Sequence, residues 1–384
     1  MPPSLRFDFD RYPYLTPNLA GIGGEIRRQN TDFQVTELPA YPLSGEGEHL
    51  FVYLEKEGLT TRQLLERVRD TLGVKEKDIG VAGLKDKRAL TRQWFSLPAK
   101  FEPRLGALGG LEGIRVLEVA RHSNKLKIGH LRGNRFRILI RTVESQASGV
   151  EGQNQSSADP RGPTPEARQA QASAILSTLA AQGIPNYFGP QRFGLGGRNA
   201  ERGYDLVTGG RVHVLPWLKK FLVSSLQSLL FNDWVQVRLE QGTFNQVIEG
   251  DVAKKHDSGG EFVVEDAGLE NPRALRFEIS ATGPLYGKKY REAQGAARAL
   301  EDEILAHYEL TRAHFDRRFG DRRLIRLPLA DWSVEEAPEG LWVSFFLPKG
   351  AYATAVLREL MKRNPEEGEE GEEEPAGPEA EGPA

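Results

Sequence analysis

One segment of the sequence concentrates side chains that could do chemistry. Residues 83–95 read GLKDKRALTRQWF, so a single aspartate, Asp86, lies between basic residues on both sides. Nearby cations favour the ionised form of a carboxylate, and an ionised aspartate can act as a nucleophile or as a general base. A cationic loop is also suited to a phosphate backbone. The alternative is a solvated turn between two strands, because runs of charged residues usually cover exposed faces.

The residues and motifs that several other kinds of catalytic site require are absent from this sequence. There is no cysteine, which excludes disulfides, thiolate metal ligands and cysteine nucleophiles. The sequence contains no GxxxxGK(S/T) loop, no HExxH pair and no GxSxG elbow, and its seven histidines are scattered. A metal site is therefore not expected. Carboxylates, lysines, tyrosines and hydroxyl groups remain as candidates for catalysis.

The net charge divides between two unlike parts of the chain. The formal charge is −3, but residues 365–384 contain nine Glu and no basic residue, so the rest carries +6 (−3 + 9). Because the acidic end has no apolar periodicity, we expect it to be a disordered tail. The positive remainder is suited to a polyanionic partner.

Length and patterning limit the protein class. A chain of 384 residues indicates about two domains. It begins Met-Pro-Pro without an apolar leader, and no stretch approaches the ~18 apolar residues needed to span a membrane. We therefore expect a cytoplasmic protein with no membrane partner.

The first 144 residues have the patterning of a mixed unit of strands and helices. Apolar spacing over residues 61–72, with Thr60 or Thr61 placed as the cap, predicts a helix. Alternation predicts strands over residues 33–38, 49–55, 114–120, 126–129 and 135–142. Short apolar runs at 78–82 and 94–97 flank the charged segment that contains Asp86.

A breaker-rich stretch separates this unit from the rest. Residues 145–165 are polar and rich in Gly, Ser and Pro, which predicts a linker or a long surface loop. Beyond it we expect helices over 165–182, 214–240 and 291–309, strands over 324–329 and 341–347, and a last helix through Leu360.

Five blocks of the sequence together resemble the signatures of the tRNA pseudouridine synthase D (TruD) family. In chain order they are residues 31–37 (TDFQVTE), 83–94 (GLKDKRALTRQW), 132–136 (RGNRF), 186–194 (NYFGPQRFG) and 347–360 (LPKGAYATAVLREL). Each block alone is short. Five collinear blocks between about residues 26 and 360 are highly specific.

The resemblance implies a fold. It is α+β: a pseudouridine synthase fold, with a mixed, mainly antiparallel sheet flanked by helices, and an inserted second α/β domain. The catalytic domain would comprise residues 1–144 and 328–364, and the insert residues 166–327. RNA would lie in the cleft between them.

The resemblance also implies an activity. Family members isomerise uridine to pseudouridine, typically at position 13 of tRNA, without a cofactor or a metal. By this resemblance Asp86 is the catalytic aspartate. It could attack C1′, add to C6 or remove a ribose proton, and the sequence leaves these three open. A base in structured RNA must be flipped out to reach it. We expect tRNA as partner and a monomeric protein.

Five further residues occupy positions that the resemblance assigns to substrate binding. Phe136 matches an aromatic that packs on the target base, although its alternation with Ile138 and Ile140 equally predicts an inward strand residue. Asn134 matches a polar position beside it, or shapes the turn after Gly133.

The other three lie elsewhere along the chain. Tyr352 stands where the family usually has Phe, which keeps a stacking face and adds a hydroxyl. Arg27 stands where the family has a basic residue able to pair with the catalytic aspartate, but Arg28 is adjacent. Lys85 contributes to the cationic field around Asp86, or contacts a phosphate.

Two other functions remain open at this level. One is a non-catalytic RNA-binding or RNA-folding protein of the same architecture. The other is a carboxylate-based hydrolase acting on RNA or a nucleoside. The intact segment from Gly83 to Asp86 favours the synthase over both.

Overall fold

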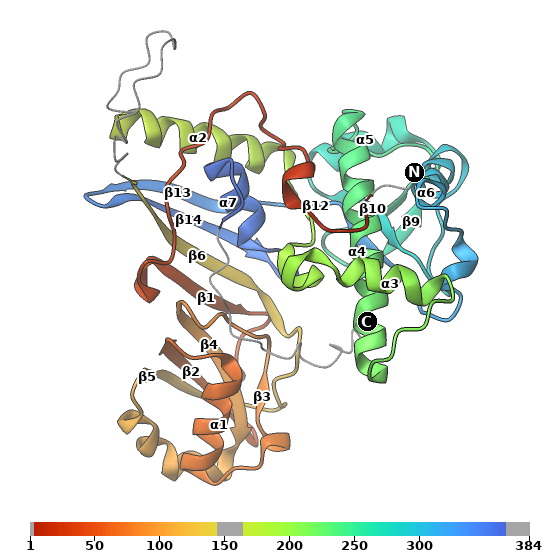
Figure 1. The fold of residues 1–384 in the computed structure, drawn as a ribbon. Helices are drawn as coiled ribbons and strands as arrows, with labels where there is room; N and C mark the ends of the chain where they lie inside the picture. Colours follow the sequence, from red (N-terminus) through yellow and green to blue (C-terminus); the bar gives the residue numbers. More distant parts are fainter. Residues whose placement is uncertain (1–3, 144–163, 366–384) are drawn as a thin grey trace.

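The computed structural model describes residues 4–143 and 164–365, and its two units lie side by side (Figure 1). The larger unit is built on an eight-stranded sheet in the order β13-β14-β6-β1-β4-β2-β5, with β3 pairing to β4. Its strands are β1 (Phe33–Pro39), β2 (His49–Glu57), β3 (Gly80–Val81), β4 (Leu90–Pro98), β5 (Ile114–His122), β6 (Leu131–Arg141), β13 (Ala330–Ala337) and β14 (Gly340–Pro348).

The sheet is mixed but mainly antiparallel, as expected. Among the described strands of this sheet only β1 and β4 run parallel, with Val35 opposite Thr91. On its other side β1 pairs antiparallel with β6, so that Val35 faces Phe136 and Glu37 faces Asn134. Cross-strand partners point to the same face of a sheet. This register therefore gathers side chains from β1, β4 and β6 on one face.

Helices cover the two ends of that face. The helix α1 (Thr61–Leu72) packs Leu64, Val68 and Leu72 onto apolar residues of β2 and β4. At the other end, α2 (Pro165–Gln182) and α7 (Ala353–Met361) share one core with β6 and β14. Local signals fix α1: the Thr60 Oγ1 accepts a hydrogen bond from the Gln63 amide, and the Gln63 side chain accepts one from the Thr60 amide.

Between these two cores, the same face carries buried polar side chains. Lys56 and Thr91 lie opposite each other on β2 and β4, and Gln93 follows on β4. Glu37 lies on β1, and it is 2% exposed. Buried polar groups require partners, so this belt across the middle of the sheet is the natural place for a functional site.

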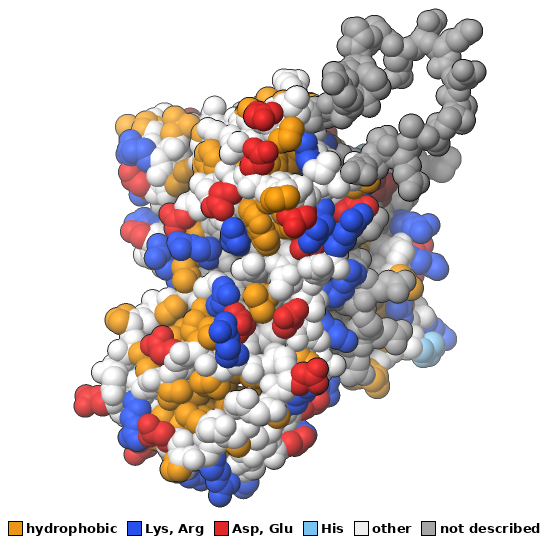
Figure 2. All heavy atoms as spheres, turned by 90° about the vertical axis from the view of Figure 1, so that its left-hand side faces the viewer, with side chains coloured by type: hydrophobic (Ala, Val, Ile, Leu, Met, Phe, Trp, Pro, Cys, Tyr) orange, Lys and Arg blue, Asp and Glu red, His pale blue; other side chains and the backbone are white. Residues whose placement is uncertain are grey.

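The opposite face of the sheet is also partly apolar. Tyr53 stacks on Trp94 at a ring distance of 4.8 Å, and Phe51 packs beside Trp94. Figure 2 shows hydrophobic side chains gathered on one side of the lower part of the molecule, which holds β2, β4 and β5.

The second unit combines helices with small antiparallel sheets. Its main sheet has the order β11-β10-β8-β9, and β12 pairs separately with β7. The elements are β7 (Ile184–Pro185), α3 (Asn199–Val207), α4 (Pro216–Glu240), β8 (Val252–Lys255), β9 (Glu261–Val263), α5 (Ala267–Leu275), β10 (Ile279–Leu285), α6 (Gly295–His307), β11 (Asp321–Leu324) and β12 (Arg326–Leu327).

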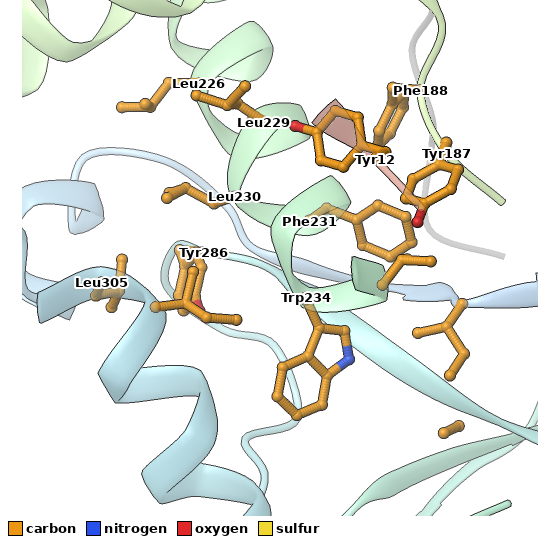
Figure 3. Close-up of a cluster of buried hydrophobic side chains, with 14 of the residues drawn as sticks. Tyr12, Tyr187, Phe188, Leu226, Leu229, Leu230, Phe231, Trp234, Tyr286 and Leu305 are labelled. Carbon is orange, nitrogen blue, oxygen red and sulfur yellow. The ribbon is translucent and has the colours of Figure 1, made fainter. Parts of the chain in front are cut away.

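The helix α4 forms the centre of this unit. Its residues Leu226, Leu230 and Trp234 point into a core that Figure 3 shows in close-up. Tyr12 from the N-terminal segment and Tyr187 and Phe188 from the loop after β7 pack into the same cluster. The loop signature at residues 186–194 therefore packs into the core of the second unit.

Two packing relationships cross the expected domain division. The helix α2 was expected to open the insert, but its residues Ile175, Leu176 and Leu179 belong to the core of the larger sheet. Conversely, Phe7, Phe9 and Tyr12 were expected in the catalytic domain and lie in the core of the second unit. An apolar stripe requires a partner surface but does not identify which one.

The remaining differences between the expected and the observed elements are smaller. The segment Leu126–Gly129, expected as a strand, has no strand pairing; the Leu126 amide instead donates to the Ser96 hydroxyl at 2.9 Å. The linker expected at 145–165 and the tail expected at 365–384 lie almost wholly outside the described residues. Within residues 4–143 and 164–365, no helix is long and apolar enough to cross a membrane.

Candidate active site

Asp86 lies in the loop between β3 and β4, above the polar belt of the sheet. Its side chain is 36% exposed, and its Oδ2 lies 2.6 Å from the Nη2 of Arg27. Arg27 thus forms an ion pair with the Asp86 side chain. A charge-assisted hydrogen bond of this length fixes the orientation of the carboxylate. The rest of the carboxyl group stays accessible from solvent.

Two further contacts hold Arg27 in place, and its backbone is strained. Its guanidinium carbon lies 4.1 Å from the centre of the Phe33 ring, and its side chain is 8% exposed. Its carbonyl oxygen accepts a hydrogen bond from Arg88 Nη2 at 3.0 Å. Its backbone φ is +61°, in the left-handed region that non-glycine residues rarely adopt. Such strain persists where the surroundings enforce it, and it concentrates at functional sites.

Lys56 supports the Asp86 loop from below. This lysine is fully buried in β2, and its ammonium donates to the carbonyl oxygen of Asp86 at 2.9 Å. It also donates to the carbonyl of Leu59 just before α1. The two contacts join the Asp86 loop to the start of α1. The backbone of Asp86 is therefore anchored separately from its side chain.

Lys85 points into the sheet instead of toward solvent. Its Nζ lies 2.6 Å from Glu37 Oε2, and the two side chains are 5% and 1% exposed. The Lys85 amide donates to Thr61 Oγ1 at 2.8 Å, and Glu37 Oε1 also accepts from the Trp94 amide at 3.3 Å. Lys85 thus locks the loop onto β1 and α1, and in this structure its ammonium is not available to a phosphate.

Asn134 and Phe136 lie on the same face as Glu37. Asn134 is opposite Glu37, and its side-chain oxygen is buried with no hydrogen-bond partner among the described residues. An unpartnered buried acceptor has a cost of about 1–3 kcal/mol, which a substrate donor would relieve. The Phe136 ring is 7% exposed and packs against Phe33 at 6.2 Å. Phe136 therefore reaches Arg27 through Phe33.

Tyr352 stands apart from this cluster. It is 45% exposed and immediately precedes α7. The strand β14 places Leu347 opposite Asn134 and ends at Pro348 opposite Gly133, four residues before Tyr352. No hydrogen bond or ring contact within the described part of the chain joins Tyr352 to Asp86, Arg27 or Phe136. Its ring is free to meet a ligand.

The sequence singled out Asp86, Arg27, Lys85, Asn134 and Phe136, and the structure brings these five together. Tyr352 makes no hydrogen bond or ring contact with these five among the described residues. Sequence reasoning missed Lys56, Glu37 and Phe33. For Lys56 and Glu37 the available signal was a charged residue at an inward position of a strand, since charged residues are rarely buried unless paired.

No group of three or more His, Asp or Glu side chains able to hold a metal ion occurs among residues 4–143 and 164–365. The chemistry on offer is that of one carboxylate oriented by one buried guanidinium.

Comparison with known proteins gives a consistent result. The sequence model of the family "tRNA pseudouridine synthase D (TruD)" matches residues 11–210 and 207–360. A tRNA pseudouridine synthase D from Thermus thermophilus is 60% identical over 358 residues, which cover 93% of this chain and 94% of that protein. The protein of the same name from Anaeromyxobacter dehalogenans is 44% identical over 368 residues, covering 93% and 99%.

A solved structure shares the fold. The crystal structure of a protein assigned to tRNA pseudouridine synthase D (TruD), from Methanosarcina mazei, superimposes with a TM-score of 0.75. It covers 94% of this chain and 99% of that chain at 24% sequence identity. The expected α+β fold is thereby confirmed.

Proposed function

Because the chain belongs to the tRNA pseudouridine synthase D (TruD) family, and is thus an isomerase acting on tRNA, we propose that Asp86 is its catalytic residue. The single observation that carries the proposal is the geometry of Asp86. It is a partly exposed carboxylate oriented by Arg27 at 2.6 Å and set above a belt of buried polar side chains.

The reaction needs no co-reactant. The glycosidic bond from N1 of uracil to C1′ breaks, a bond from C5 to C1′ forms, and the hydrogen lost from C5 is balanced by one gained at N1. One carboxylate can serve this sequence in three ways: by attacking C1′, by adding to C6, or by removing a proton from the ribose. An oriented carboxylate with one accessible side is compatible with each.

The target base has to leave the RNA stack to reach Asp86, which costs a few kcal/mol. We propose that Tyr352 offsets part of that cost by stacking, at about 1–3 kcal/mol per base. The unpartnered Asn134 oxygen is suited to accept a hydrogen bond from an N–H of uracil. Phe136 supports the floor of the site through Phe33. Position 13 of tRNA is proposed as the target from the family alone.

The remaining inherited expectations stay predictions. They are a monomeric protein, catalysis without a cofactor, and a cytoplasmic location.

The decisive experiment replaces the carboxylate with its isosteric amide. Asp86→Asn should reduce pseudouridine formation in a tRNA transcript by on the order of 10⁴-fold, while the affinity for tRNA changes little. The matched control is Asp70→Asn on the exposed side of α1, which should keep full activity.

Three results would contradict the proposal. Full activity of Asp86→Asn would remove the role given to this residue. Rescue of a deletion strain by an inactive Asp86→Asn protein would favour the non-catalytic RNA-binding function. Free uracil or cut RNA in place of pseudouridine would favour the hydrolase.

A further inference from the structure

Phe319 is an exposed aromatic ring far from Asp86 in the sequence. In the described part of the chain, the large hydrophobic side chains with high exposure include only two aromatic rings, Tyr352 and Phe319. Tyr352 is the ring proposed above to stack on the target base. Phe319 is 69% exposed, more than Tyr352, and it lies in the second unit just before β11.

The backbone holds this ring outward. The Lys288 amide donates to the Arg318 carbonyl at 2.7 Å, and the Gly320 amide donates to the Lys288 carbonyl at 2.9 Å. These bonds close the segment around Phe319 onto the loop after β10. Two glycines allow the approach: a Cβ on Gly287 would lie 2.3 Å from the Gly320 nitrogen. The exposed position of Phe319 is therefore built into the fold, and is not the swing of a free loop.

Two lysines lie close to the ring, and two arginines precede it in the sequence. The Lys288 and Lys289 ammonium groups lie 5.1 and 5.7 Å from its centre. Arg317 and Arg318 precede it directly. Among the described residues no ion pair joins any of these four cations to a carboxylate, although Asp316 and Asp321 flank the segment. An aromatic face among unpaired cations is the arrangement that binds single-stranded nucleic acid, because the ring stacks on a base while the cations meet its phosphates.

Phe319 also lies close enough to Tyr352 for one RNA molecule to contact both rings. Arg323 Nη2 lies 3.3 Å from the carbonyl of Gly350, two residues before Tyr352. Phe319 precedes Arg323 by four residues, a length of chain that spans at most about 13 Å at ~3.3 Å per extended residue. That equals about four base steps at ~3.4 Å per step. One RNA molecule can therefore contact both exposed aromatic rings.

We propose that Phe319, Lys288, Lys289, Arg317 and Arg318 form a second RNA contact, in which an unpaired base of the tRNA stacks on Phe319. The inference rests on tRNA being the substrate. The lysine ammonium groups that lie over the ring in the free protein turn to the neighbouring phosphates when the base arrives. Their flexible, strongly hydrated side chains permit this exchange.

The test separates stacking from charge and binding from chemistry. Phe319→Ala should weaken tRNA binding about 5- to 150-fold, which corresponds to 1–3 kcal/mol, with kcat at saturating tRNA unchanged. Phe319→Trp should bind at least as tightly as the wild type. The matched control is Leu269→Ala, which removes another exposed apolar side chain of this unit and should leave binding unchanged.

Salt dependence distinguishes the two kinds of contact. Lys288→Gln combined with Lys289→Gln should flatten the dependence of log K on log salt by about 1 to 2, whereas Phe319→Ala should leave that slope unchanged. Binding by Phe319→Ala equal to wild type would overturn the proposal. So would equal losses in Phe319→Ala and Phe319→Trp, which would indicate a role in folding or in binding a protein.

The test of the Phe319 contact can succeed or fail independently of the catalytic role proposed for Asp86. If Phe319→Ala weakens tRNA binding in a protein that makes no pseudouridine, the second contact stands and the proposed chemistry falls. If the wild type makes pseudouridine and Phe319→Ala binds normally, the reverse holds.

Discussion

Arg27 places its guanidinium 2.6 Å from the Asp86 carboxylate while its own backbone adopts a φ of +61°. Arg28, the neighbour with the same side chain, is 58% exposed and pairs with Glu25 three residues away. The left-handed turn at Arg27 sends its guanidinium onto Phe33 and toward Asp86. The strained residue is therefore the one that contacts the catalytic candidate.

A substitution can separate the backbone of Arg27 from its charge. Arg27→Gly removes the cost of the left-handed conformation, about 1 kcal/mol or more, and also removes the guanidinium. We expect unfolding in urea to need about the same denaturant concentration or more, and kcat for pseudouridine formation to fall about 100-fold. Arg28→Ala is the control and should keep its activity. A fully active Arg27→Gly would show that Asp86 needs no cation to orient it.

The buried pair of Lys85 and Glu37 makes a prediction about stability. Lys85→Met leaves the Glu37 carboxylate buried without its counter-charge, so the free energy of unfolding should fall by about 3–5 kcal/mol. Adding Glu37→Leu should recover part of that loss, because no charge then remains buried. Chemical denaturation measures both, with the exposed neighbour Lys87→Met as control. Unchanged stability together with a raised KM would instead identify Lys85 as a phosphate contact.

Lys56 should act on the position of Asp86 and not on tRNA binding. Lys56→Met keeps the apolar stem but leaves the Asp86 and Leu59 carbonyls without their donor. We expect kcat to fall about 10- to 100-fold with KM nearly unchanged, and stability to fall by about 1–3 kcal/mol. Steady-state kinetics of this variant and of the exposed Lys77→Met would check it. Equal changes in kcat and KM would contradict a positioning role.

Acid sensitivity should depend in part on His256. Burial, with the positive charge of Arg326, lowers the pKa of His256 to about 4. Between about pH 6.5 and pH 4 the unfolded chain binds a proton here that the folded protein does not. This histidine therefore favours the folded state above pH 6.5, and that contribution is lost as the pH falls to 4.

The measurement compares unfolding free energies at about pH 7 and pH 4.5. His256→Gln should lose less stability over this interval than the wild type, by on the order of 1 kcal/mol after allowing for partial exposure. The exposed His213→Gln should behave as the wild type. If His256→Gln loses as much unfolding free energy over this interval as the wild type, other groups are responsible for the acid sensitivity.

Elements with local signals were predictable almost to the residue. The helix over residues 61–72 begins and ends where its spacing and its Thr60 cap place it, and the helix over 165–182 does so as well. The packing of the second helix was not predictable, because an apolar stripe fits either core. The strand predicted over residues 126–129 was wrong for a related reason. Leu126 is buried, at 3% exposed, so its apolar character reflects burial in a loop and not pairing in a strand.

By itself the sequence determined the family and singled out Asp86, because collinear blocks of residues survive in the linear order of the chain. Only the tertiary structure decided that Arg27, and not Arg28, pairs with Asp86, and that Lys85 serves Glu37. These pairs join residues 59 and 48 positions apart. A sequence pattern reports interactions within a few turns or strand residues. Which distant charges meet is fixed by sheet register and by the need of every buried charge for a partner.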